Sequence, residues 1–458
     1  MLLPVALLNS LQNVLGFDQE AFEKVHQSGE QITSIRRNPN KIFNNQYSIF
    51  NDQLEQVPWN PNGYYLPERP SFTLDPLFHA GAYYVQEASS MFLEEALKQT
   101  VDLSQPIKVL DLCAAPGGKS TLLQSLISDK SLLVSNEVIK TRVNILSENI
   151  TKWGATNVIV TNNDPKDFQR LRNYFDVIVV DAPCSGSGLF RKDTEAINEW
   201  SEQNVELCGQ RQQRILADII PSLKDGGTLI YSTCSYSETE DEEIADWVVE
   251  ELEVGSLKLE VDGNWGIVET QSKKNNAFGY RFYPNKVKGE GFFIAAFTKK
   301  KTLDEAFQEK FKKGKSERLT AKEIEVVKTY LKNPSDFFFI KQKDEVIALP
   351  SHLEQDLATI QSSLYIKKAG IKLGTIIRDE LIPDHELALG TIVKEKVPSV
   401  EVDKETALQY LRKQEIKIDF DKRGWSLLTY NQLPLGWVKV LHNRVNNYYP
   451  ANWRILNK

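Results

Sequence analysis

Two cysteines in similar surroundings stand out in a chain that has only four cysteines. They lie in the runs Asp181-Ala182-Pro183-Cys184 and Ser232-Thr233-Cys234-Ser235, each directly after a segment that is expected to form a β-strand. A thiolate can add to an electron-poor carbon, and a second thiol can assist a later step of the same reaction. The pair therefore indicates covalent chemistry, with Asp181 placed to take part in it.

A loop of small residues comes earlier in the chain and indicates a bound ligand. Its members are Cys113, Ala114, Ala115, Pro116, Gly117, Gly118 and Lys119. Small side chains let a ligand approach the backbone, and the free amides at the start of the following helix favour a carboxylate or a phosphate. However, Cys113 stands where a P-loop needs its first glycine, and the Gly-x-Gly-x-x-Gly spacing of a dinucleotide loop is absent.

Two carboxylates narrow the choice of ligand. Glu137 ends the next expected strand, about 20 residues after the loop, where a carboxylate can accept hydrogen bonds from both ribose hydroxyls. Asp164 follows the third strand and can accept a hydrogen bond from an exocyclic amine such as that of adenine. Either residue alone could be an ordinary surface carboxylate. Together with the loop they describe a nucleoside whose tail is an amino acid, so S-adenosylmethionine is the expected cofactor.

Five short apolar segments must position these residues, and helical segments follow most of them. The expected strands are Lys108–Leu112, Leu132–Asn136, Val158–Thr161, Asp176–Val180 and Thr228–Ser232. Nearly continuous apolar strands separated by helices are typical of an α/β fold whose parallel sheet is covered on both faces. Ligands bind at the carboxyl ends of such strands, which is where the loop, the carboxylates and the cysteines fall.

The sequence predicts four parts. They are an N-terminal α+β extension (1–95), the α/β domain (96–300), a linker with a middle domain (301–388) and a small mixed or β domain (389–458). The extension begins with an amphipathic helical stretch and becomes extended around Ile32–Asn38. A basic, helix-like segment runs from Lys299 to about Lys332, and a solvated linker is its simplest interpretation.

Composition argues against several classes of protein. No apolar run approaches the roughly 18 to 20 residues of a membrane helix, and the apolar start Met1–Leu8 lacks the basic region of a signal peptide. A cytoplasmic location without membrane association is therefore expected.

The absence of a Cys-x-x-Cys pair and of a histidine cluster predicts no metal site. The net charge is −7, but residues 301–458 carry +5 against −12 for residues 1–300, so the C-terminal part is better suited to a polyanion.

Four ordered motifs give the chain a family resemblance. The runs VLDLCAAPGGKS, FDVIVVDAPCSGSGLFRKD, GGTLIYSTCSYSETEDEE and RFYPNKVKGEGFF resemble those of the Sun (Fmu) family of RNA cytosine-5 methyltransferases, over roughly residues 1–300. The C-terminal part, with Pro383–Ala388 and a PUA-like final module, is similar to the RsmF branch, which modifies 16S ribosomal RNA. The resemblance implies a Rossmann-like, S-adenosylmethionine-dependent methyltransferase domain with an N-terminal RNA-binding extension and PUA-like C-terminal domains.

The resemblance also implies a role for each cysteine. C5 of cytosine is a poor nucleophile, and a thiolate that adds at C6 makes C5 reactive enough to take the sulfonium methyl. DNA cytosine methyltransferases use a Pro-Cys nucleophile, which would be Cys184. The RNA family uses the Thr-Cys cysteine, which matches Cys234, and assigns Cys184 to product release. The sequence alone does not separate the two roles.

Four further residues have weaker assignments. Asp181 is expected to hold the edge of the cytosine, and Lys119 to point towards the base or the cofactor tail. The alternative for Lys119 is a solvated lysine at a helix start. Cys113 is interpreted as a small residue of the turn, and Cys208 as a helix residue without a catalytic role.

An RNA substrate requires basic and aromatic contacts around the site, because the target base must leave its stack to reach a buried cysteine. Candidate phosphate contacts are Arg36, Arg37, Arg191, Lys192, Arg281, Lys286 and Lys288. The final module adds Lys439, His442, Arg444 and Arg454 beside Trp437, Tyr448, Tyr449 and Trp453. A small aromatic core with a charged rim is the alternative for this second group.

The favoured hypothesis is a monomeric enzyme that methylates C5 of a cytosine in 16S ribosomal RNA, either naked or in the 30S subunit. A transfer-RNA methyltransferase with a similar core is one alternative. A non-catalytic ribosome assembly factor that binds RNA is another, although a scaffold has no need for Cys184, Cys234, Asp181 and Glu137 together.

Overall fold

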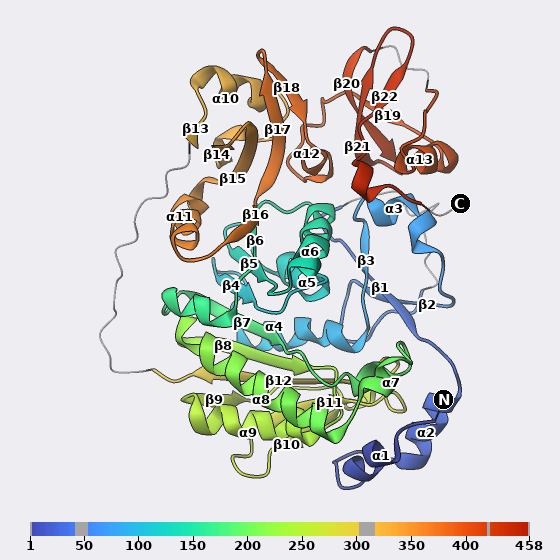
Figure 1. Cartoon of the computed structure of the whole chain (residues 1–458), viewed down its shortest axis with the longest axis vertical. Coiled ribbons are helices and arrows are strands. Elements are labelled where there is room, and N and C mark those ends of the chain that lie inside the picture. Colours follow the sequence, from blue (N-terminus) through green and yellow to red (C-terminus); the bar gives the residue numbers. More distant parts are fainter. Residues whose placement is uncertain (1, 42–53, 302–316, 419–421, 457–458) are drawn as a thin grey trace.

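The computed structural model describes residues 2–41, 54–301, 317–418 and 422–456. These residues form four β-sheets and the helices that cover them (Figure 1). The middle of the predicted basic segment, residues 302–316, lies outside the described residues. Among the described residues, no helix is both long and apolar enough to span a membrane.

The main sheet has ten strands, and its centre is parallel as predicted. The parallel strands, in spatial order, are β6 (Val158–Thr161), β5 (Leu132–Asn136), β4 (Lys108–Asp111), β7 (Phe175–Asp181) and β8 (Leu223–Thr233). Four antiparallel strands that the sequence did not predict extend it beyond β8: β12 (Phe292–Lys299), β11 (Phe278–Phe282), β10 (Val268–Gln271) and β9 (Val254–Leu257). The sheet is therefore mixed.

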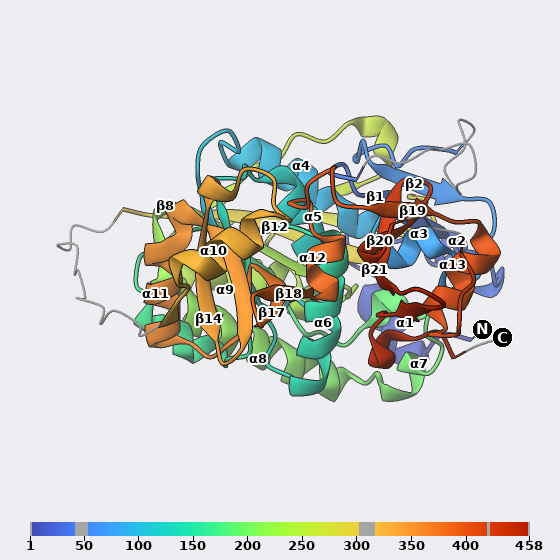
Figure 2. The same cartoon turned by 90° about the horizontal axis from the view of Figure 1, so that it is seen from above.

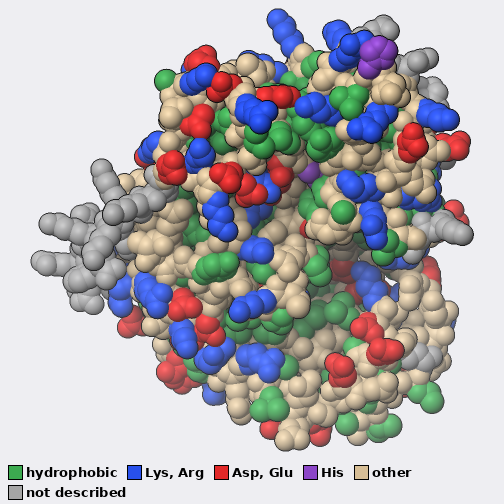
Figure 3. All heavy atoms as spheres, turned by 45° about the horizontal axis from the view of Figure 1, so that its top comes forward, with side chains coloured by type: hydrophobic (Ala, Val, Ile, Leu, Met, Phe, Trp, Pro, Cys, Tyr) green, Lys and Arg blue, Asp and Glu red, His purple; other side chains and the backbone are tan. Residues whose placement is uncertain are grey.

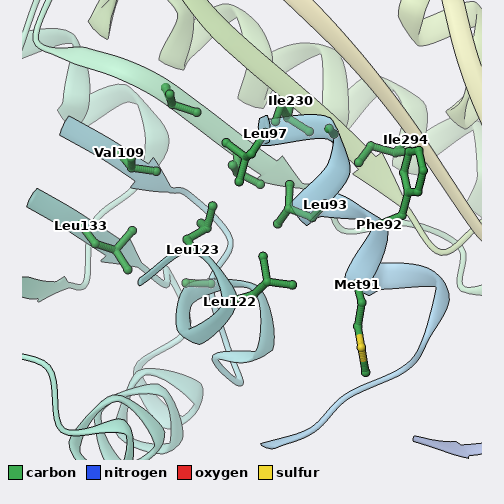
Figure 4. Packing of buried hydrophobic residues seen from close by; sticks show 14 of the residues in the cluster. Met91, Phe92, Leu93, Leu97, Val109, Leu122, Leu123, Leu133, Ile230 and Ile294 are labelled. Carbon is green, nitrogen blue, oxygen red and sulfur yellow. The ribbon is translucent and has the colours of Figure 1, made fainter. Parts of the chain in front are cut away.

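Helices cover both faces of this sheet because alternate strand residues enter separate cores. Val109 of β4 belongs to the core that also contains α4 (Leu93–Thr100), α5 (Gly118–Leu126) and α6 (Lys140–Trp153). Leu110 belongs to the core on the opposite face, with α8 (Glu202–Ile219), α9 (Glu242–Glu251) and α11 (Glu354–Ser363). Figure 4 shows the first core, in which Leu97 of α4 and Leu123 of α5 approach Val109 and Ile230 of the strands. The small loop before α5 is thus anchored between strand and helix.

The N-terminal extension is α+β, as the resemblance implied. It contains the helices α1 (Val5–Leu11), α2 (Gln19–Gln27) and α3 (Pro76–His79), and a sheet of β1 (Thr33–Arg37), β2 (Gly63–Leu66) and β3 (Tyr83–Val85). A 3-10 helix, η3 (Ser89–Phe92), leads into α4. The amphipathic helix and the extended segment that follows it are confirmed.

Two smaller sheets make up the C-terminal part. The first holds β13 (Glu317–Arg318), β14 (Phe337–Gln342), β15 (Glu345–Pro350), β17 (Ile371–Ile377) and β18 (Glu380–Pro383), with α10 (Ala321–Lys328). The second holds β19 (Ser399–Glu401), β20 (Gly424–Tyr430), β21 (Leu433–Val440) and β22 (Val445–Asn447), with α12 (His385–Leu389) preceding it and α13 (Lys404–Leu411) between β19 and β20.

The C-terminal part is packed onto the rest of the chain. Both of its sheets lie beyond α6 at one end of the molecule in Figure 1, and Figure 2 shows the same end from above. The strand β16 (Ile366–Ala369) leaves this part and pairs with β6 at the edge of the main sheet. One hydrophobic cluster joins Ile35 and Tyr83 of the N-terminal sheet to Tyr410 and Leu428 of the final module. The N-terminal sheet and the final module are therefore in direct contact.

Candidate active site

The two predicted cysteines meet. Cys184 follows β7 and Cys234 follows β8, and these neighbouring parallel strands end in register, with Asp181 opposite Ser232. The two sulfur atoms are 2.9 Å apart, and both cysteines are free thiols. The hydrogen bond to Cys234, together with burial, raises the pKa of the Cys184 thiol well above its usual value. The two thiols share one hydrogen bond, in which either sulfur can be the donor.

Asp181 and Lys119 form an ion pair beside the cysteines, with 2.8 Å between Lys119 Nζ and Asp181 Oδ2. The other carboxylate oxygen accepts a hydrogen bond from the Ser232 hydroxyl at 2.9 Å. Burial by itself lowers the pKa of Lys119, but Asp181 and Asp111 outweigh it, so the pKa is raised and the amine stays charged. The alternative of a solvated Lys119 is wrong, because its side chain is only 13% exposed.

A cavity of about 600 Å³ brings most of the predicted residues together. It is lined by Cys113, Ala115, Pro116, Glu137, Asp164, Asp181, Cys184 and Cys234. A neighbouring cavity of about 170 Å³ is lined by Ala114, Gly118 and Lys119, and shares Asp181 with the first. Gly117 lines neither cavity and instead precedes the first turn of α5, with a φ of 121° that glycine adopts without strain.

The two predicted nucleoside carboxylates stand at one end of the larger cavity. Glu137 is buried, accepts a hydrogen bond from the Ile139 amide at 2.9 Å, and directs its second oxygen towards Arg142 at 3.5 Å. Asp164 accepts from the Lys166 amide at 3.2 Å. These local hydrogen bonds fix both side chains and leave each carboxylate with capacity for further donors.

Apolar side chains that the sequence interpretation missed complete this end of the cavity. Val138 and Ile139 line it, although they are 52% and 46% exposed, and Pro165 lies beside them. Exposed aliphatic groups next to carboxylates suit an adenosine, whose base needs apolar contacts and whose ribose needs acceptors. The residues present therefore fit S-adenosylmethionine. Their position directly after Glu137 and Asp164 is the signal that would have revealed them.

Side chains of the neighbouring helix α6 and of strand β4 hold the small loop and the start of α5 in place. Arg142 donates a hydrogen bond to the Ala115 carbonyl at 2.6 Å, and Asn149 donates one to the Pro116 carbonyl at 2.8 Å. Asp111, at the end of β4, accepts from the Ser120 hydroxyl of α5 at 2.6 Å. Burial of this carboxyl raises its pKa to about 7. The sequence interpretation gave no role to Asp111.

Another missed residue is Glu240, in the 3-10 helix η7 (Glu238–Glu240). Its fully buried carboxylate contacts the residue after each cysteine, Ser185 and Ser235. It stands in the acidic run Glu238–Glu243, to which the sequence analysis gave no role, and such a run is typical of a solvated segment, so the sequence carried no signal for its burial. Among the described residues, no group of three or more His, Cys, Asp or Glu side chains is arranged to hold a metal ion.

Three of the predicted phosphate contacts are wrong. Arg36, Arg191 and Arg281 are all buried. Arg36 donates to the Thr121 hydroxyl at 2.6 Å, and Arg191 donates to the Glu30 carbonyl at 2.7 Å. Arg281 forms ion pairs with the buried residues Asp241 and Glu242. These guanidinium groups stabilise the packing of the extension and of the cysteine loops and cannot reach a phosphate.

The predicted RNA contacts of the final module also include both buried and exposed residues. Trp437 is buried and donates to the Asp384 carbonyl at 2.8 Å, and Tyr449 is buried as well, so both belong to an aromatic core. His442, Arg444 and Arg454 are exposed. On the face shown in Figure 3, Lys and Arg side chains are scattered among Asp and Glu and do not form a single basic patch.

The chain matches three family models in sequence. Residues 3–88 match the N-terminal domain of 16S rRNA methyltransferase RsmF, residues 98–298 match 16S rRNA methyltransferase RsmB/F, and residues 397–455 match the methyltransferase RsmF PUA domain. The ribosomal RNA small subunit methyltransferase F of Aeromonas salmonicida is 31% identical over 91% of this chain and 90% of its own length. That of Aliivibrio fischeri is 30% identical over 87% and 85%.

Solved structures share the central fold. A methyltransferase homologue from Pyrococcus horikoshii is 27% identical and superposes with a TM-score of 0.50, covering 65% of this chain and 100% of its own. NSun6 from the same organism, at 20% identity and a TM-score of 0.53, covers 65% of this chain and 99% of its own and supports the fold alone.

Proposed function

Because this chain belongs to the ribosomal RNA small subunit methyltransferase F family, with the fold of S-adenosylmethionine-dependent methyltransferases, we propose that it methylates C5 of a cytosine in small-subunit ribosomal RNA. Cys234 forms the covalent bond to the base, and Cys184 assists its release. The enzyme acts in the cytoplasm, where that RNA is found.

The contact between the two sulfurs is the observation that supports this proposal most strongly. Cys184 and Cys234 lie 2.9 Å apart in a cavity that also contains Glu137 and Asp164, the expected cofactor carboxylates. A methyltransferase that acts on an amine or a hydroxyl has no use for a second thiol at this distance from the first. Two thiols are useful where one adds to a ring carbon and must later be expelled.

The environment of the pair supports the assignment of Cys234 as the nucleophile. The raised pKa of Cys184 favours its protonated form, and a protonated Cys184 can donate a hydrogen bond to the Cys234 sulfur when Cys234 reacts as a thiolate. The thiolate adds to C6 of cytosine, and the electron pair of the C5–C6 double bond becomes available at C5. S-adenosylmethionine, when bound, supplies a methyl group on a positively charged sulfur for C5 to attack. A base then removes the C5 proton, and the returning electron pair expels the Cys234 thiolate, which can accept a proton from Cys184.

Asp181, held by Lys119, would stabilise the positive charge that develops on the base. Addition at C6 makes N3 more basic, so a carboxylate at N3 can stabilise the protonated ring. Asp181 lies on both cavities, and its ion pair with Lys119 holds it in a fixed orientation. Lys119 therefore orients Asp181, and it lines the smaller cavity, where it would face the base or the cofactor tail.

The cofactor is assigned to the larger cavity. Glu137 would accept the ribose hydroxyls, Asp164 the adenine amine, and Val138, Ile139 and Pro165 would contact the ring faces. The loop from Cys113 to Lys119 would bind the amino-acid tail through its backbone amides. Arg142 holds this loop through the Ala115 carbonyl.

The test is transfer of labelled methyl from S-adenosylmethionine to 30S subunits, naked 16S ribosomal RNA and bulk transfer RNA, with mass spectrometry of the modified base. Label in 5-methylcytosine of the small-subunit RNA is the expected result. Label in transfer RNA alone would retain the chemistry and overturn the substrate. No label in any RNA, with S-adenosylmethionine bound normally, would favour a non-catalytic assembly factor.

A further inference from the structure

One buried carboxylate lies between the two cysteine loops. The side chain of Glu240 is fully buried. Its Oε1 accepts hydrogen bonds from the Ser185 amide at 2.7 Å and from the Gln212 side chain at 3.3 Å. Its Oε2 accepts from the hydroxyl of Ser185 and, at 2.6 Å, from that of Ser235. Since Ser185 follows Cys184 and Ser235 follows Cys234, a single side chain contacts the neighbour of each cysteine.

The hydrogen bonds around Glu240 require an acceptor at Oε1. The Ser185 amide and the Gln212 side-chain amide can only donate to it, whereas the two serine hydroxyls at Oε2 can donate or accept. Burial raises the pKa of Glu240, and the hydrogen bonds from Ser185, Ser235 and Gln212 offset part of that rise. A glutamine of the same size would remove the negative charge and place an NH₂ group against the two hydroxyls, which would have to turn from donors into acceptors and so change the positions of both serines.

The backbone of Glu240 is fixed independently of its side chain. The Tyr231 hydroxyl donates to the Glu240 carbonyl at 2.6 Å, which anchors η7 to strand β8. The carboxylate is therefore attached to the sheet, and the two serines are attached to the carboxylate. The carboxylate therefore links the two serines to each other and to the sheet.

Other hydrogen bonds also join the two loops. The Ser185 and Ser235 hydroxyls lie 3.4 Å apart, against 2.6 Å from the Ser235 hydroxyl to Glu240. The Gly188 amide donates to the Cys234 carbonyl at 2.8 Å, and the Tyr236 amide donates to the Ser187 hydroxyl at 3.0 Å. These hydrogen bonds keep the two loops folded together. The direct contact between Ser185 and Ser235 is much longer than the contact of either hydroxyl with Glu240, so the carboxylate is the main link between the two serines. Loss of the Glu240 carboxylate would leave the hydrogen bonds of the Gly188 and Tyr236 amides in place.

We propose that Glu240 is a positioning residue that sets the distance between the two cysteine sulfurs by binding Ser185 and Ser235 at once. The inference rests on the cysteine chemistry proposed above. Addition by Cys234 and release assisted by Cys184 both require their sulfurs to reach the same base. A misplacement of about 1 Å can lower a rate by about 10²-fold, whereas binding of S-adenosylmethionine at the far end of the cavity does not involve the serines.

The experiment compares Glu240→Gln with wild type and with Glu238→Gln, a matched control on the same 3-10 helix whose side chain faces the exposed residue Lys273. We expect kcat for methyl transfer to fall 10- to 100-fold in Glu240→Gln, with the KM for RNA and the Kd for S-adenosylmethionine within twofold of wild type. The rate of covalent adduct formation with RNA containing 5-fluorocytosine should fall with kcat. Glu238→Gln should behave as wild type.

The serines test whether Glu240 acts through them. Ser185→Ala and Ser235→Ala should each lower kcat, and adding Glu240→Gln to the variant that lacks both hydroxyls should cost less than its effect in wild type, because the contacts are shared. A Glu240→Gln enzyme with wild-type kcat would overturn the inference, as would full additivity with the serine changes. A parallel loss of S-adenosylmethionine binding and thermal stability would show a merely structural role. A wild-type enzyme that forms no adduct would overturn the proposed function as well.

Discussion

Cys184 and Cys234 are chemically alike, and only their surroundings distinguish them. The raised pKa of Cys184 favours its protonated form, which suits assistance to release and not attack on the base, so we expect the loss of each thiol to have a different consequence. In Cys234→Ala no bond to C6 can form, and methyl transfer and adduct should both be lost. In Cys184→Ala addition and methylation proceed but release is slow, so a protein–RNA adduct should accumulate and be visible as a shifted band on a denaturing gel.

Cys208→Ala is the control for loss of a thiol outside the cavity, because Cys208 lies in α8, beside Glu240, and does not line the cavity. It should retain methyl transfer and form no stable adduct. Accumulation of adduct in Cys234→Ala together with its absence in Cys184→Ala would reverse the assignment of the two roles.

Glu137 offers a test of the cofactor site at the same scale. It is 2% exposed and lines the cavity together with Val138 and Ile139. Replacing it by alanine removes the acceptor for the ribose hydroxyls, which should weaken S-adenosylmethionine binding at least tenfold, or about 1.4 kcal/mol and more. Isothermal titration calorimetry measures this directly, and the exposed Glu250→Ala on α9 should bind as wild type. Unchanged binding in Glu137→Ala would mean that the ribose lies elsewhere.

At the scale of elements, the junction of β4 and α5 depends on the Asp111 carboxyl. Its pKa is about 7 in the folded protein, against about 3.9 for an aspartate in an unfolded chain. Between these pH values the folded state holds a proton that the unfolded state has lost, so stability is fully present below about pH 4 and falls as pH rises towards 7. Asp111→Asn keeps the acceptor for Ser120 without this titration.

The difference in Tm between wild type and Asp111→Asn, measured from pH 4.5 to 7.5, should therefore shift steadily in favour of the variant as pH rises. A difference that does not change with pH would show that Asp111 stays ionised throughout. The same comparison for Asp129→Asn, an exposed position before β5, should show no such trend.

Elements were predictable where one local pattern determines them. The five parallel strands are buried on both faces, and their nearly continuous apolar runs matched the observed bounds within one residue for four of them, while β8 begins five residues before the predicted Thr228. The antiparallel strands β10 and β11 were missed because polar residues such as Glu269 interrupt them and no helix separates them. The arginines were misassigned because the sequence shows a positive charge but not its buried partner, as with Arg281 and Glu242.

At the scale of the whole molecule, some contacts between distant parts of the chain cannot be predicted from any local sequence pattern. The cysteines could be paired from the sequence because consecutive motifs of a parallel sheet end at the same edge. The packing of the final module against the N-terminal sheet could not be predicted from the sequence. It depends on apolar residues such as Ile35 and Leu428, which are far apart in the chain. RNA contacts at this scale must therefore be sought among groups that remain exposed after the ends have packed together.

Arg444 and Arg454 are such groups, since both are exposed in the final module. If they contact phosphates, replacing both by alanine should weaken binding of naked 16S ribosomal RNA and reduce the slope of log K against log salt by about 2. S-adenosylmethionine binding should not change. Lys130→Ala is the matched control, because Lys130 precedes β5 and so lies at the edge of the sheet opposite the cysteines. An unchanged salt slope in the double variant would exclude these two arginines from the RNA path and direct the search to Lys192, which lies beside the cysteine loops.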